Sequence, residues 1–485
     1  MATSEAVPFS KTGGLADVAA ALAAALSVRG AEVALFVPMH RMSESRVLPA
    51  IHDSGLRISV PVGKEQIEAT IRWTELPGSN GRVFFVDQPE HFDRPSLYGE
   101  DGDYEDNCAR FVFFSRAVLE ASRQLVLRPQ VIHCNDWQTG LIPALLDAEY
   151  RGEPGFERVA SVFTIHNLAY QGQFWHHDMP LTGLDWKYFN WEQLESYGNL
   201  NLLKAGITMC DRITTVSPTY SLEIQTSEYG NGLEGVLQHR AERLSGILNG
   251  IDTSVWNPAT DKLLPCNFDV DSVLDGKAKC KQVLQEESGL PVRSDVPLIG
   301  MVSRMSTQKG FDIIEKAAAR FLQHDLQLCI LGTGDAHCEN MCRQLADQYP
   351  EKVSVRLQFN EQVAHRIEAG SDIFLMPSRY EPCGLNQMYS LAYGTLPLVR
   401  ATGGLADSVV DATTKNLNAG TATGFAFTDY TAEALADTFD RAIKLFDDKD
   451  SWNQMVRTGM RQDWSWDRSA AEYEAIYRQA ISDRS

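Results

Sequence analysis

The hexapeptide Thr-Gly-Gly-Leu-Ala-Asp occurs twice in this chain, at residues 12–17 and again at residues 402–407. Paired glycines permit φ > 0 and let the backbone approach a ligand closely. Each copy leads into a segment of helical periodicity, and a helix that begins there directs unpaired N–H groups at an anion. The repeat therefore predicts two similar halves, each with a glycine loop suited to phosphate. A local repeat shared by two half-domains explains it equally well and is compatible with that function.

Composition narrows the class of protein. The 485 residues, 44% of them hydrophobic, suffice for about three domains or for two α/β halves of about 250 residues each. The 44 Lys and Arg against 64 Asp and Glu give a net charge of −20. So acidic a chain repels phosphates over most of its surface, which argues against partners such as nucleic acid or an anionic membrane. Any phosphate site must be a local group of cations.

The cysteines and the apolar runs bear on location. The nine cysteines lack the CxxC spacing of zinc sites, and Cys338 and Cys342 stand four apart on an expected helix. We interpret them as reduced, buried thiols, which favours a cytoplasmic protein. No run of about 18 apolar residues is long enough for a transmembrane helix. The alanine-rich stretch 16–28 contains Asp17 and is interpreted as an amphipathic helix rather than a signal sequence.

Short apolar runs alternate with helical patterns along the chain, which is typical of parallel sheets covered by helices. The predicted strands are 32–37, 131–133, 160–165, 212–216, 298–302, 326–331, 373–376 and 396–399. The alternation pauses between Asn249 and about Val296, where three prolines and a glycine cluster, and we expect a hinge there. Apolar residues at helical spacing from Tyr473 to Ala480 predict a terminal helix.

Polar groups follow several of these strands, and ligands of open α/β sheets lie beyond the carboxyl ends of strands. These groups are Lys11 before the first glycine loop, Asp136 and Trp137, His166 and Asn167, Arg304 and Lys309, and Glu381 to Gly384. Arg304 and Lys309 stand five apart just after a strand and suit a diphosphate. Taken alone, each charged residue would be interpreted as a solvated surface charge and His166 as a core histidine. The interpretation as a ligand site therefore rests on the whole set.

Six motifs together resemble the family of bacterial glycogen synthases and plant starch synthases. They span nearly the whole chain in order, at residues 11–15, 133–137, 164–172, 249–252, 303–310 and 381–385. The resemblance implies an α/β fold of GT-B type, with two Rossmann-like domains whose parallel sheets face each other across a cleft. It also implies transfer of glucose from a nucleotide sugar, usually ADP-glucose, to the non-reducing end of an α-1,4-glucan with retention.

On this reading the N-terminal, acceptor-side domain spans residues 1–248 and the C-terminal, donor-side domain spans 249–460. The helix in 461–485 is expected to pack back on the N-terminal domain. The family begins with a hydrophobic strand, of which residues 1–3 could be the end. We therefore expect the native chain to start upstream, and residues 1–3 to pair beside the strand at 32–37.

The resemblance assigns roles to individual residues. Those implied in catalysis are His166, Arg304, Lys309 and Glu381. Those implied in donor binding are Lys11, Gly13, Gly14, Phe359, Cys383, Gly384, Leu385, Thr402 and Gly403. Further cleft or acceptor residues are Asp17, Tyr104, Asp136 and Asn167. No cofactor is implied.

Within this set the cations would hold the leaving diphosphate and Glu381 would lie beside the donor sugar and ribose. His166 would hydrogen-bond the transferred glucose, and Phe359 would face the nucleotide base, where a flat apolar ring suffices. Related GT-B enzymes often carry a second glutamate eight positions after the first. Here that position is Tyr389, as in this family's own motif.

Two further patterns are weaker evidence for function. The Asp101-Gly102-Asp103 segment resembles a metal-binding motif but lies in an acidic loop away from the phosphate signals, so no metal is expected there. The set at residues 176–178 is a similarly weak metal signal. Aromatic residues crowd one segment and could stack on sugars. They are Phe174, Trp175, Trp186, Tyr188, Phe189 and Trp191. We expect most of them to pack in the core or between domains.

Three alternatives stay open. A catalytically silent glucan-binding or regulatory protein could share the scaffold, although all the catalytic positions are intact. An NAD-dependent oxidoreductase also uses glycine loops, but the first loop lacks the GxGxxG spacing and a convincing acidic ribose ligand. A glucan phosphorylase would need a pyridoxal-phosphate lysine and a much longer chain.

Overall fold

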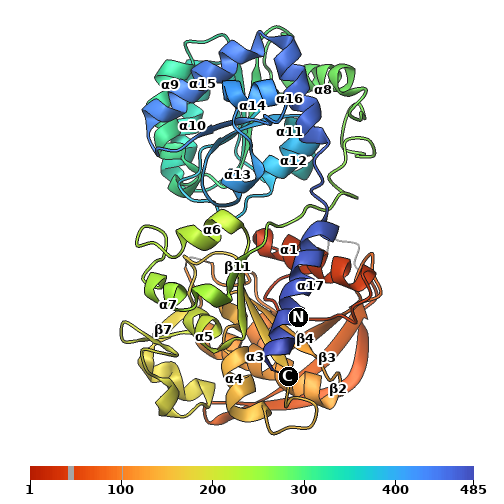
Figure 1. Ribbon diagram of the computed structural model, residues 1–485, viewed down its shortest axis with the longest axis vertical. Helices are drawn as coiled ribbons and strands as arrows, with labels where there is room; N and C mark the ends of the chain where they lie inside the picture. The colour runs from red at the N-terminus through yellow and green to blue at the C-terminus, as the bar shows by residue number, and fades with distance from the viewer. Residues whose placement is uncertain (42–48, 101, 485) are drawn as a thin grey trace. The chain divides into compact units, whose positions relative to one another are not determined.

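The computed structural model describes residues 1–41, 49–100 and 102–484. The chain forms two compact units (Figure 1): unit 1 comprises Met1–Gly250 and Trp466–Ser485, and unit 2 comprises Ile251–Ser465. The divisions between the units fall after Gly250 and after Ser465, whereas the sequence predicted them after residues 248 and 460. Unit 2 is an insertion into unit 1, because the chain leaves unit 1 and returns to it.

The large sheet of unit 1 is organised around the first three residues. In spatial order, one side holds β2 (His52–Val62), β3 (Glu65–Glu75), β4 (Arg82–Asp87) and β1 (Ala34–Pro38), and the other holds β5 (Val131–Asn135), β6 (Ala160–Ile165), β10 (Arg212–Thr215) and β11 (Leu244–Gly246). Ala2 forms parallel bridges with Phe36 of β1 and with Cys134 of β5 and so joins the two sides. The predicted pairing of residues 1–3 beside the 32–37 strand is confirmed.

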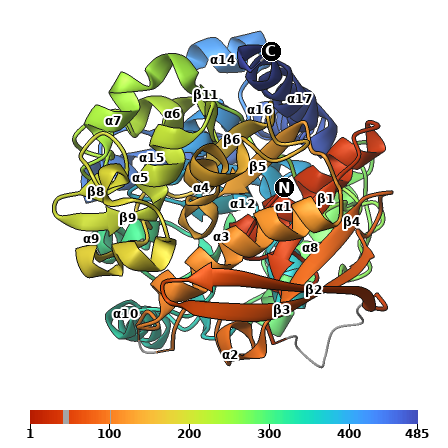
Figure 2. The ribbon, with the colours of Figure 1, turned by 90° about the horizontal axis from the view of Figure 1, so that it is seen from below.

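An antiparallel hairpin departs from the predicted all-parallel pattern. β2 pairs with β3 and β3 pairs with β4, both antiparallel, and Figure 2 shows β2 and β3 as two long arrows beside α3 (Asn107–Gln124). Gly63 has φ = 60° in the turn between β2 and β3, a conformation that favours glycine. On β2, Ile58, Val60 and Val62 are buried and alternate with exposed residues. The hairpin therefore buries one face only.

Helices cover this sheet. The longer ones are α1 (Gly14–Val28), α3, α5 (Leu202–Met209) and α17 (Trp466–Asp483), and the shorter ones are α2 (Pro89–Phe92), α4 (Ile142–Leu145), α6 (Pro218–Glu223) and α7 (Glu234–His239). The amphipathic helix predicted near the N-terminus is α1. α17 lies beside α1 (Figure 1), and Val18 and Leu22 of α1 share a buried cluster with Trp466 and Tyr473 of α17.

Unit 2 is a six-stranded parallel sheet. Its spatial order is β14 (Val353–Arg356), β13 (Gln327–Leu331), β12 (Leu298–Val302), β15 (Ile373–Met376), β16 (Leu396–Arg400) and β17 (Phe425–Phe427). Adjacent residues of one strand enter different cores, as Leu298 and Ile299 do, so helices cover both faces. These helices are α8 (Val273–Glu287), α9 (Phe311–Phe321), α10 (Ala336–Gln348), α11 (Glu361–Gly370), α12 (Asn386–Ala392), α13 (Gly403–Ser408), α14 (Thr414–Ala419), α15 (Ala432–Phe446) and α16 (Lys449–Met460). The four strands predicted here are all present.

The predicted pause between Asn249 and Val296 is wrong in one respect, because it contains α8. Cys280 and Leu284 of this helix are buried, and α8 packs on α11. The prolines and the glycine flank the helix rather than interrupt it. This segment is therefore largely part of the packed body of unit 2.

The remaining composition-based expectations concern thiols and membranes. All nine cysteines are free, and all but the half-buried Cys266 are buried, as predicted. Over the residues that the structure describes, no helix combines the length and the apolar character needed to cross a membrane.

Candidate functional site

In unit 1 the sequence-predicted residues gather where the strand order reverses. From residues 1–3 the chain proceeds outward through β1 and β4 on one side, and later through β6 and β10 beyond β5 on the other. The crevice beyond the carboxyl ends of strands at such a switch point is where open α/β sheets bind ligands. The first glycine loop follows residues 1–3, and Asp136 and His166 follow β5 and β6.

The first glycine loop is held by Glu5, a residue that the sequence did not single out. The Glu5 carboxylate accepts hydrogen bonds from the Thr12 backbone N–H and, at 3.0 Å, from the Thr12 hydroxyl. Burial raises the pKa of Glu5 to about 7. Gly13 has an extended φ of −149°, so the expected positive φ is absent here. An added Cβ on Gly14 would meet nothing within 4 Å, so this loop is open around its glycines.

Asp136 and His166 are tied together at the ends of β5 and β6. The His166 backbone N–H donates to Asp136 Oδ1 at 2.7 Å, and the His166 ring Nε2 lies 2.9 Å from Asn135 Oδ1. Asp136 adopts φ = 56° and ψ = −179°, a region that costs a non-glycine residue about 1–3 kcal/mol. Burial raises the pKa of Asp136 to about 7 and lowers that of His166 to about 3. The imidazole is therefore neutral at neutral pH.

The raised pKa values of the Glu5 and Asp136 carboxyls predict that the stability of the fold depends on pH. A carboxyl whose pKa is higher in the folded state keeps its proton there while the unfolded chain releases it, so the free energy of unfolding falls as pH rises from about 4 to about 7. Each group should contribute on the order of 3 kcal/mol to that fall. We expect Glu5→Gln and Asp136→Asn to match the parent protein near pH 4 and to exceed its stability near pH 8. Denaturant titrations at several pH values test this, and parallel curves for parent and variants would contradict it.

The other predicted residues of unit 1 have separate partners. Lys11 Nζ forms an ion pair with Asp17 at 2.8 Å, and both side chains are about one third exposed. Asn167 Oδ1 accepts the Ala169 N–H at 3.0 Å, within its own turn. The Tyr104 ring lies under the guanidinium of Arg94, 4.9 Å away.

Tyr98, which the sequence did not single out, contacts the segment that leads into the first glycine loop. The Tyr98 hydroxyl is 2.7 Å from Ser4 Oγ. The sequence offered no spacing signal for this contact, because the strand order brings residues 4 and 98 together.

In unit 2 the strand order also reverses, between β12 and β15, and the predicted cation and carboxylate meet there. Lys309, in the short turn 307–309 after β12, donates to Glu381 Oε2 at 2.5 Å, and the Ser378 hydroxyl donates to the same oxygen at 3.1 Å. Glu381 is buried, and a buried carboxylate needs such partners. The pair lies at the position where this kind of sheet binds a ligand.

The second glycine loop packs against the Glu381 segment. Gly403 has φ = 45°, and an added Cβ would lie 1.9 Å from the Glu381 carbonyl oxygen. The Gly404 N–H donates to the carbonyls of Glu381 and Pro382 at 3.3 and 3.2 Å. The two predicted motifs are thus one structure, and its glycines serve close packing between two loops.

The remaining donor-side residues surround this structure or stand apart from it. Cys383 and Thr402 are buried, whereas Gly384, with φ = 71°, and Leu385 at the start of α12 are half-buried. Arg304 is exposed, and its guanidinium donates to Gln308 at 3.2 Å. The Phe359 ring is 90% exposed in the loop before α11. A flat ring this exposed is open to a ligand.

Tyr389, at the position of the second glutamate of related enzymes, has a packing role. Its ring stacks on Trp256 with centroids 3.8 Å apart, and His365 stacks on the other face of Trp256 at 3.8 Å. His365 Nδ1 in turn lies 2.7 Å from Asp261. This stack fixes the segment that follows the Gly250 division onto α11 and α12.

The aromatic segment of unit 1 is not core. None of its six predicted rings is buried, and Trp175, Trp186 and Trp191 are 63%, 51% and 73% exposed. The expectation of core packing is wrong here, because the short strands β7 (Gln173–Trp175), β8 (Glu195–Ser196) and β9 (Asn199–Asn201) form a small separate sheet. Trp186 contacts Phe189 edge to face at 5.5 Å.

The metal-like motif gives no described site. Asp101 lies outside the described residues. Across the ranges that the structure does describe, no group of three His, Cys, Asp or Glu side chains is arranged to hold a metal ion.

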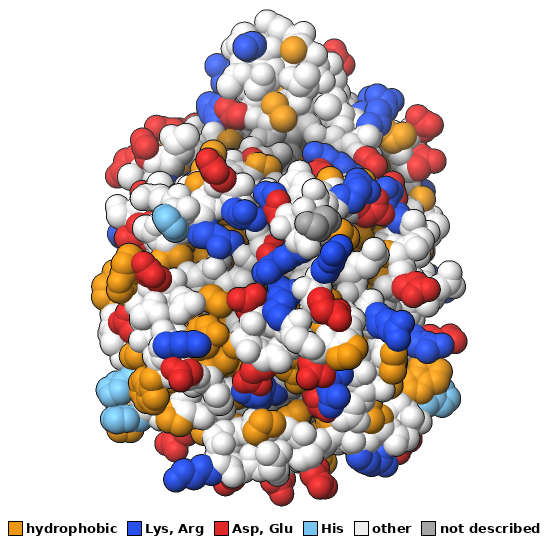
Figure 3. Space-filling view, turned by 60° about the horizontal axis from the view of Figure 1, so that its bottom comes forward, with side chains coloured by type: hydrophobic (Ala, Val, Ile, Leu, Met, Phe, Trp, Pro, Cys, Tyr) orange, Lys and Arg blue, Asp and Glu red, His pale blue; other side chains and the backbone are white. Residues whose placement is uncertain are grey.

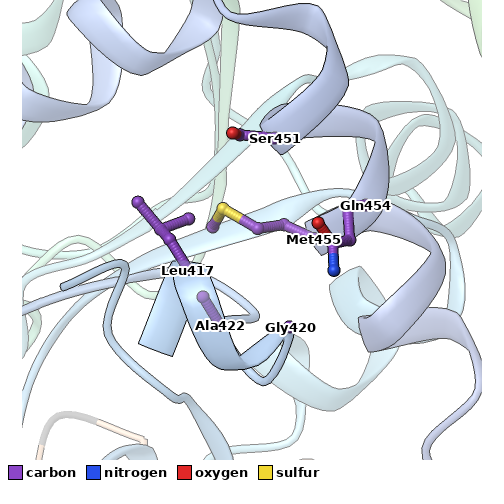
Figure 4. A pocket seen from close by; sticks show the side chains of 6 residues that line it. All are labelled: Leu417, Gly420, Ala422, Ser451, Gln454 and Met455. Atoms are coloured by element: carbon purple, nitrogen blue, oxygen red, sulfur yellow. The ribbon is translucent and has the colours of Figure 1, made fainter. Parts of the chain in front are cut away.

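A small hollow elsewhere in unit 2 is unrelated to these residues. It is lined by Leu417, Gly420, Ala422, Ser451, Gln454 and Met455 (Figure 4). Its empty volume is about 140 Å³, less than the several hundred Å³ of a usual ligand pocket, and it has no charged lining.

The surface charge is mixed on the face shown in Figure 3. Acidic and basic side chains are interspersed there, so the net charge does not form one acidic field on that face.

Family models match both units. A model of the starch synthase catalytic domain matches residues 1–239, and a model of glycosyl transferases group 1 matches residues 285–458. The glycogen synthase of Anaeromyxobacter dehalogenans is 48% identical over 480 residues, which cover 98% of this chain and 97% of that protein. The glycogen synthase of Rhodopirellula baltica is 44% identical over 493 residues, with coverage of 99% and 97%.

Solved structures give the same picture. The catalytic domain of starch synthase IV from Arabidopsis thaliana, bound to ADP and acarbose, matches with a TM-score of 0.91 and 33% identity over 99% of this chain and 98% of that one. Sucrose-phosphate synthase from Thermosynechococcus elongatus, with a TM-score of 0.58, 16% identity and coverage of 95% and 92%, shows likeness of fold alone. The predicted GT-B fold class, with parallel sheets in two α/β domains, is confirmed.

Proposed function

Since this chain belongs to the family of bacterial glycogen synthases and plant starch synthases, we propose that it transfers glucose from ADP-glucose to the non-reducing end of an α-1,4-glucan with retention of configuration. The Arabidopsis relative, which binds ADP and acarbose, is similar over nearly the whole length of both chains. That similarity supports ADP as the nucleotide and a glucan as the acceptor.

The observation that carries the proposal is the convergence at the switch point of unit 2. Lys309 and Arg304 follow β12, Glu381 follows β15, and the second glycine loop follows β16, three strands that are neighbours in the sheet. In our proposal the two cations bind the diphosphate of the donor. Glu381 then hydrogen-bonds the donor sugar and ribose, and Cys383 to Leu385 shape the glucose pocket.

The chemistry follows from where charge grows. As the bond from the sugar to the diphosphate breaks, negative charge develops on the leaving oxygen, and fixed cations stabilise it without reorganisation. We propose that Lys309 and Arg304 supply this stabilisation and that the acceptor hydroxyl attacks from the face that the diphosphate leaves, while its proton passes to an oxygen of the departing diphosphate. Retention then needs no covalent intermediate on a carboxylate, and catalysis consists mainly of positioning and leaving-group stabilisation.

Unit 1 would bind the other parts of the substrates. Lys11 and the backbone of Gly13 and Gly14 would hold donor phosphate, and His166 would hydrogen-bond the transferred glucose. Asp136, Asn167, Asp17 and Tyr104 are the further proposed cleft residues. The nine free cysteines support a cytoplasmic location. A catalytically silent glucan-binding protein is not favoured, because the named relatives are glycogen synthases over the full chain.

A transfer assay tests this function. Radiolabelled ADP-glucose and UDP-glucose are each offered with a maltooligosaccharide, and the anomeric configuration of the product is determined by NMR. We expect incorporation from ADP-glucose to exceed that from UDP-glucose, with an α-linked product. Absence of transfer from either donor, by a folded protein that binds glucan, would favour the silent alternative.

We also expect transfer to persist in EDTA, because two cationic side chains and the helix starts after the glycine loops meet the donor phosphates in place of a divalent ion. The measurement is the initial rate with and without chelator. Suppose instead that transfer requires added Mn²⁺ or Mg²⁺ and that Asp103→Ala abolishes this dependence on metal. That result would restore the metal interpretation of the 101–103 segment. Glu105→Ala in the same loop is the control.

A further inference from the structure

Asn135 contacts both the first residues of the chain and the His166 ring. It is the last residue of β5 and is 99% buried, since only 1% of its surface is exposed. Its Nδ2 donates to the Ala2 carbonyl at 3.0 Å, while its Oδ1 lies 2.9 Å from His166 Nε2. Both ends of the amide are therefore engaged.

The Ala2 carbonyl determines which way this amide points. A carbonyl oxygen only accepts hydrogen bonds, and the backbone N–H of Asn135 also donates to this one, at 3.2 Å. If the amide were flipped, Oδ1 would face that carbonyl oxygen and Nδ2 would face the ring, so two acceptors would be in contact. The observed orientation presents an acceptor to His166 Nε2, and Nε2 must then carry the ring hydrogen.

The other ring nitrogen is consequently a hydrogen-bond acceptor. Burial lowers the pKa of His166 to about 3, so the ring is neutral and holds one hydrogen. No hydrogen bond to His166 Nδ1 is formed by any residue in the described parts of the chain, and the side chain is only half-buried. The backbone N–H of His166 is fixed separately, by Asp136.

We propose that Asn135 is a positioning residue that holds His166 in the Nε2–H tautomer, so that the Nδ1 lone pair accepts a hydrogen bond from a hydroxyl of the transferred sugar. The second half of this proposal rests on the proposed function, whereas the tautomer does not. The opposite tautomer would present a donor at Nδ1 and would force the sugar hydroxyl to turn its own hydrogen elsewhere. Ala2 thereby contributes to the site through the orientation of one amide.

The tautomer can be observed without substrate. Protein labelled with ¹⁵N-histidine is examined by long-range ¹H–¹⁵N correlation, and the His166 signals are those that vanish in His166→Gln. We expect the hydrogen on Nε2 and an unprotonated Nδ1 at neutral pH. A hydrogen on Nδ1 in the parent protein would overturn the proposal, whether or not the protein proves to be a glucosyltransferase.

Two substitutions and a control separate positioning from stability. Asn135→Leu removes the oxygen that accepts from His166 Nε2, so the ring hydrogen should be shared between the two ring nitrogens and kcat/KM should fall about 10- to 100-fold. Asn135→Asp keeps an accepting oxygen, so the hydrogen should stay on Nε2. The control is Asn201→Leu, which removes another buried amide, one that donates to Gln171 at 2.7 Å, and should leave the His166 tautomer unchanged. If Asn135→Leu does not fold, the parent spectrum and Asn135→Asp still decide the matter.

The hydroxyl itself is identified with donors that each lack one hydroxyl of the glucose. One of these deoxy substrates lacks the hydroxyl that donates its hydrogen bond to Nδ1. With that substrate, Asn135→Leu and the parent protein should have the same kcat/KM. An equal penalty with every deoxy donor would refute the contact with the sugar, while the spectrum would still report on the tautomer.

Discussion

Replacing Lys309 with alanine is expected to lower kcat by about two to three powers of ten, because the charge that this ammonium meets grows in the transition state. The substitution also leaves the buried Glu381 without its cationic partner, and the Ser378 hydroxyl alone remains on that oxygen. Arg304→Ala should act in the same direction. The measurement is kcat and KM for the donor at saturating glucan.

Lys352→Ala is the matched control for Lys309→Ala. Lys352 is also a part-buried lysine of unit 2, but it donates to the Leu322 and His324 carbonyls at 3.0 and 2.8 Å, outside the proposed site. We expect it to lower stability and to leave kcat nearly unchanged. A Lys309→Ala enzyme with parental turnover and only a raised KM would show that this cation binds the ground state and does not assist departure.

The two copies of the repeated hexapeptide should differ strongly in how much stability the same glycine-to-alanine substitution costs. Gly403→Ala is expected to destabilise unit 2 by about 3 kcal/mol, since it combines a clash against backbone with a positive φ. The new Cβ would lie 1.9 Å from the Glu381 carbonyl oxygen. Gly13→Ala, at the same place in the first copy, should change stability by less than about 1 kcal/mol, because its φ is ordinary and the nearest atom lies at 3.9 Å.

Differential scanning calorimetry on both variants compares the two positions, with the transitions of the two units followed separately. Gly403→Ala should also lose transfer activity, because it displaces the segment that carries Glu381. Equal stability losses at Gly13 and Gly403 would contradict the difference in packing between the two loops.

Much of the sheet could be predicted, because parallel strands buried on both faces are continuous apolar runs. All eight predicted strands are present, with ends that differ by at most a few residues. The missed β2–β3 hairpin follows a different pattern, in which apolar residues such as Ile58 and Val60 alternate with exposed ones. That alternation was present in the sequence, so the hairpin could have been found. The three- and four-residue strands β11, β14 and β17 are too short for their periodicity to stand out.

The site divides in a similar way. Residues directly after strands, such as Asp136 and Glu381, could be selected because the ends of parallel strands meet at one edge. Glu5, Tyr98 and Asn135 could not, because their contacts depend on residues 1–3 lying between β1 and β5. Strand order is a long-range property, and no local spacing encodes it. The glycines at 403–404 were selected for the right loop, yet their close contact is with Glu381 and Pro382.

The insertion of unit 2 into unit 1 has a consequence for synthesis on the ribosome. The apolar face of α1 emerges early, but its partner α17 is made only after the whole of unit 2. Unit 2 can fold first, because its two ends meet in a bridge between Ile251 and Ser465 and it contains its own cores. Until α17 appears, the nascent N-terminal segment must expose Val18, Leu22 and Leu26, a state that is prone to aggregate. A fragment of residues 1–250 should therefore depend on chaperones, whereas one of residues 251–465 should fold without help.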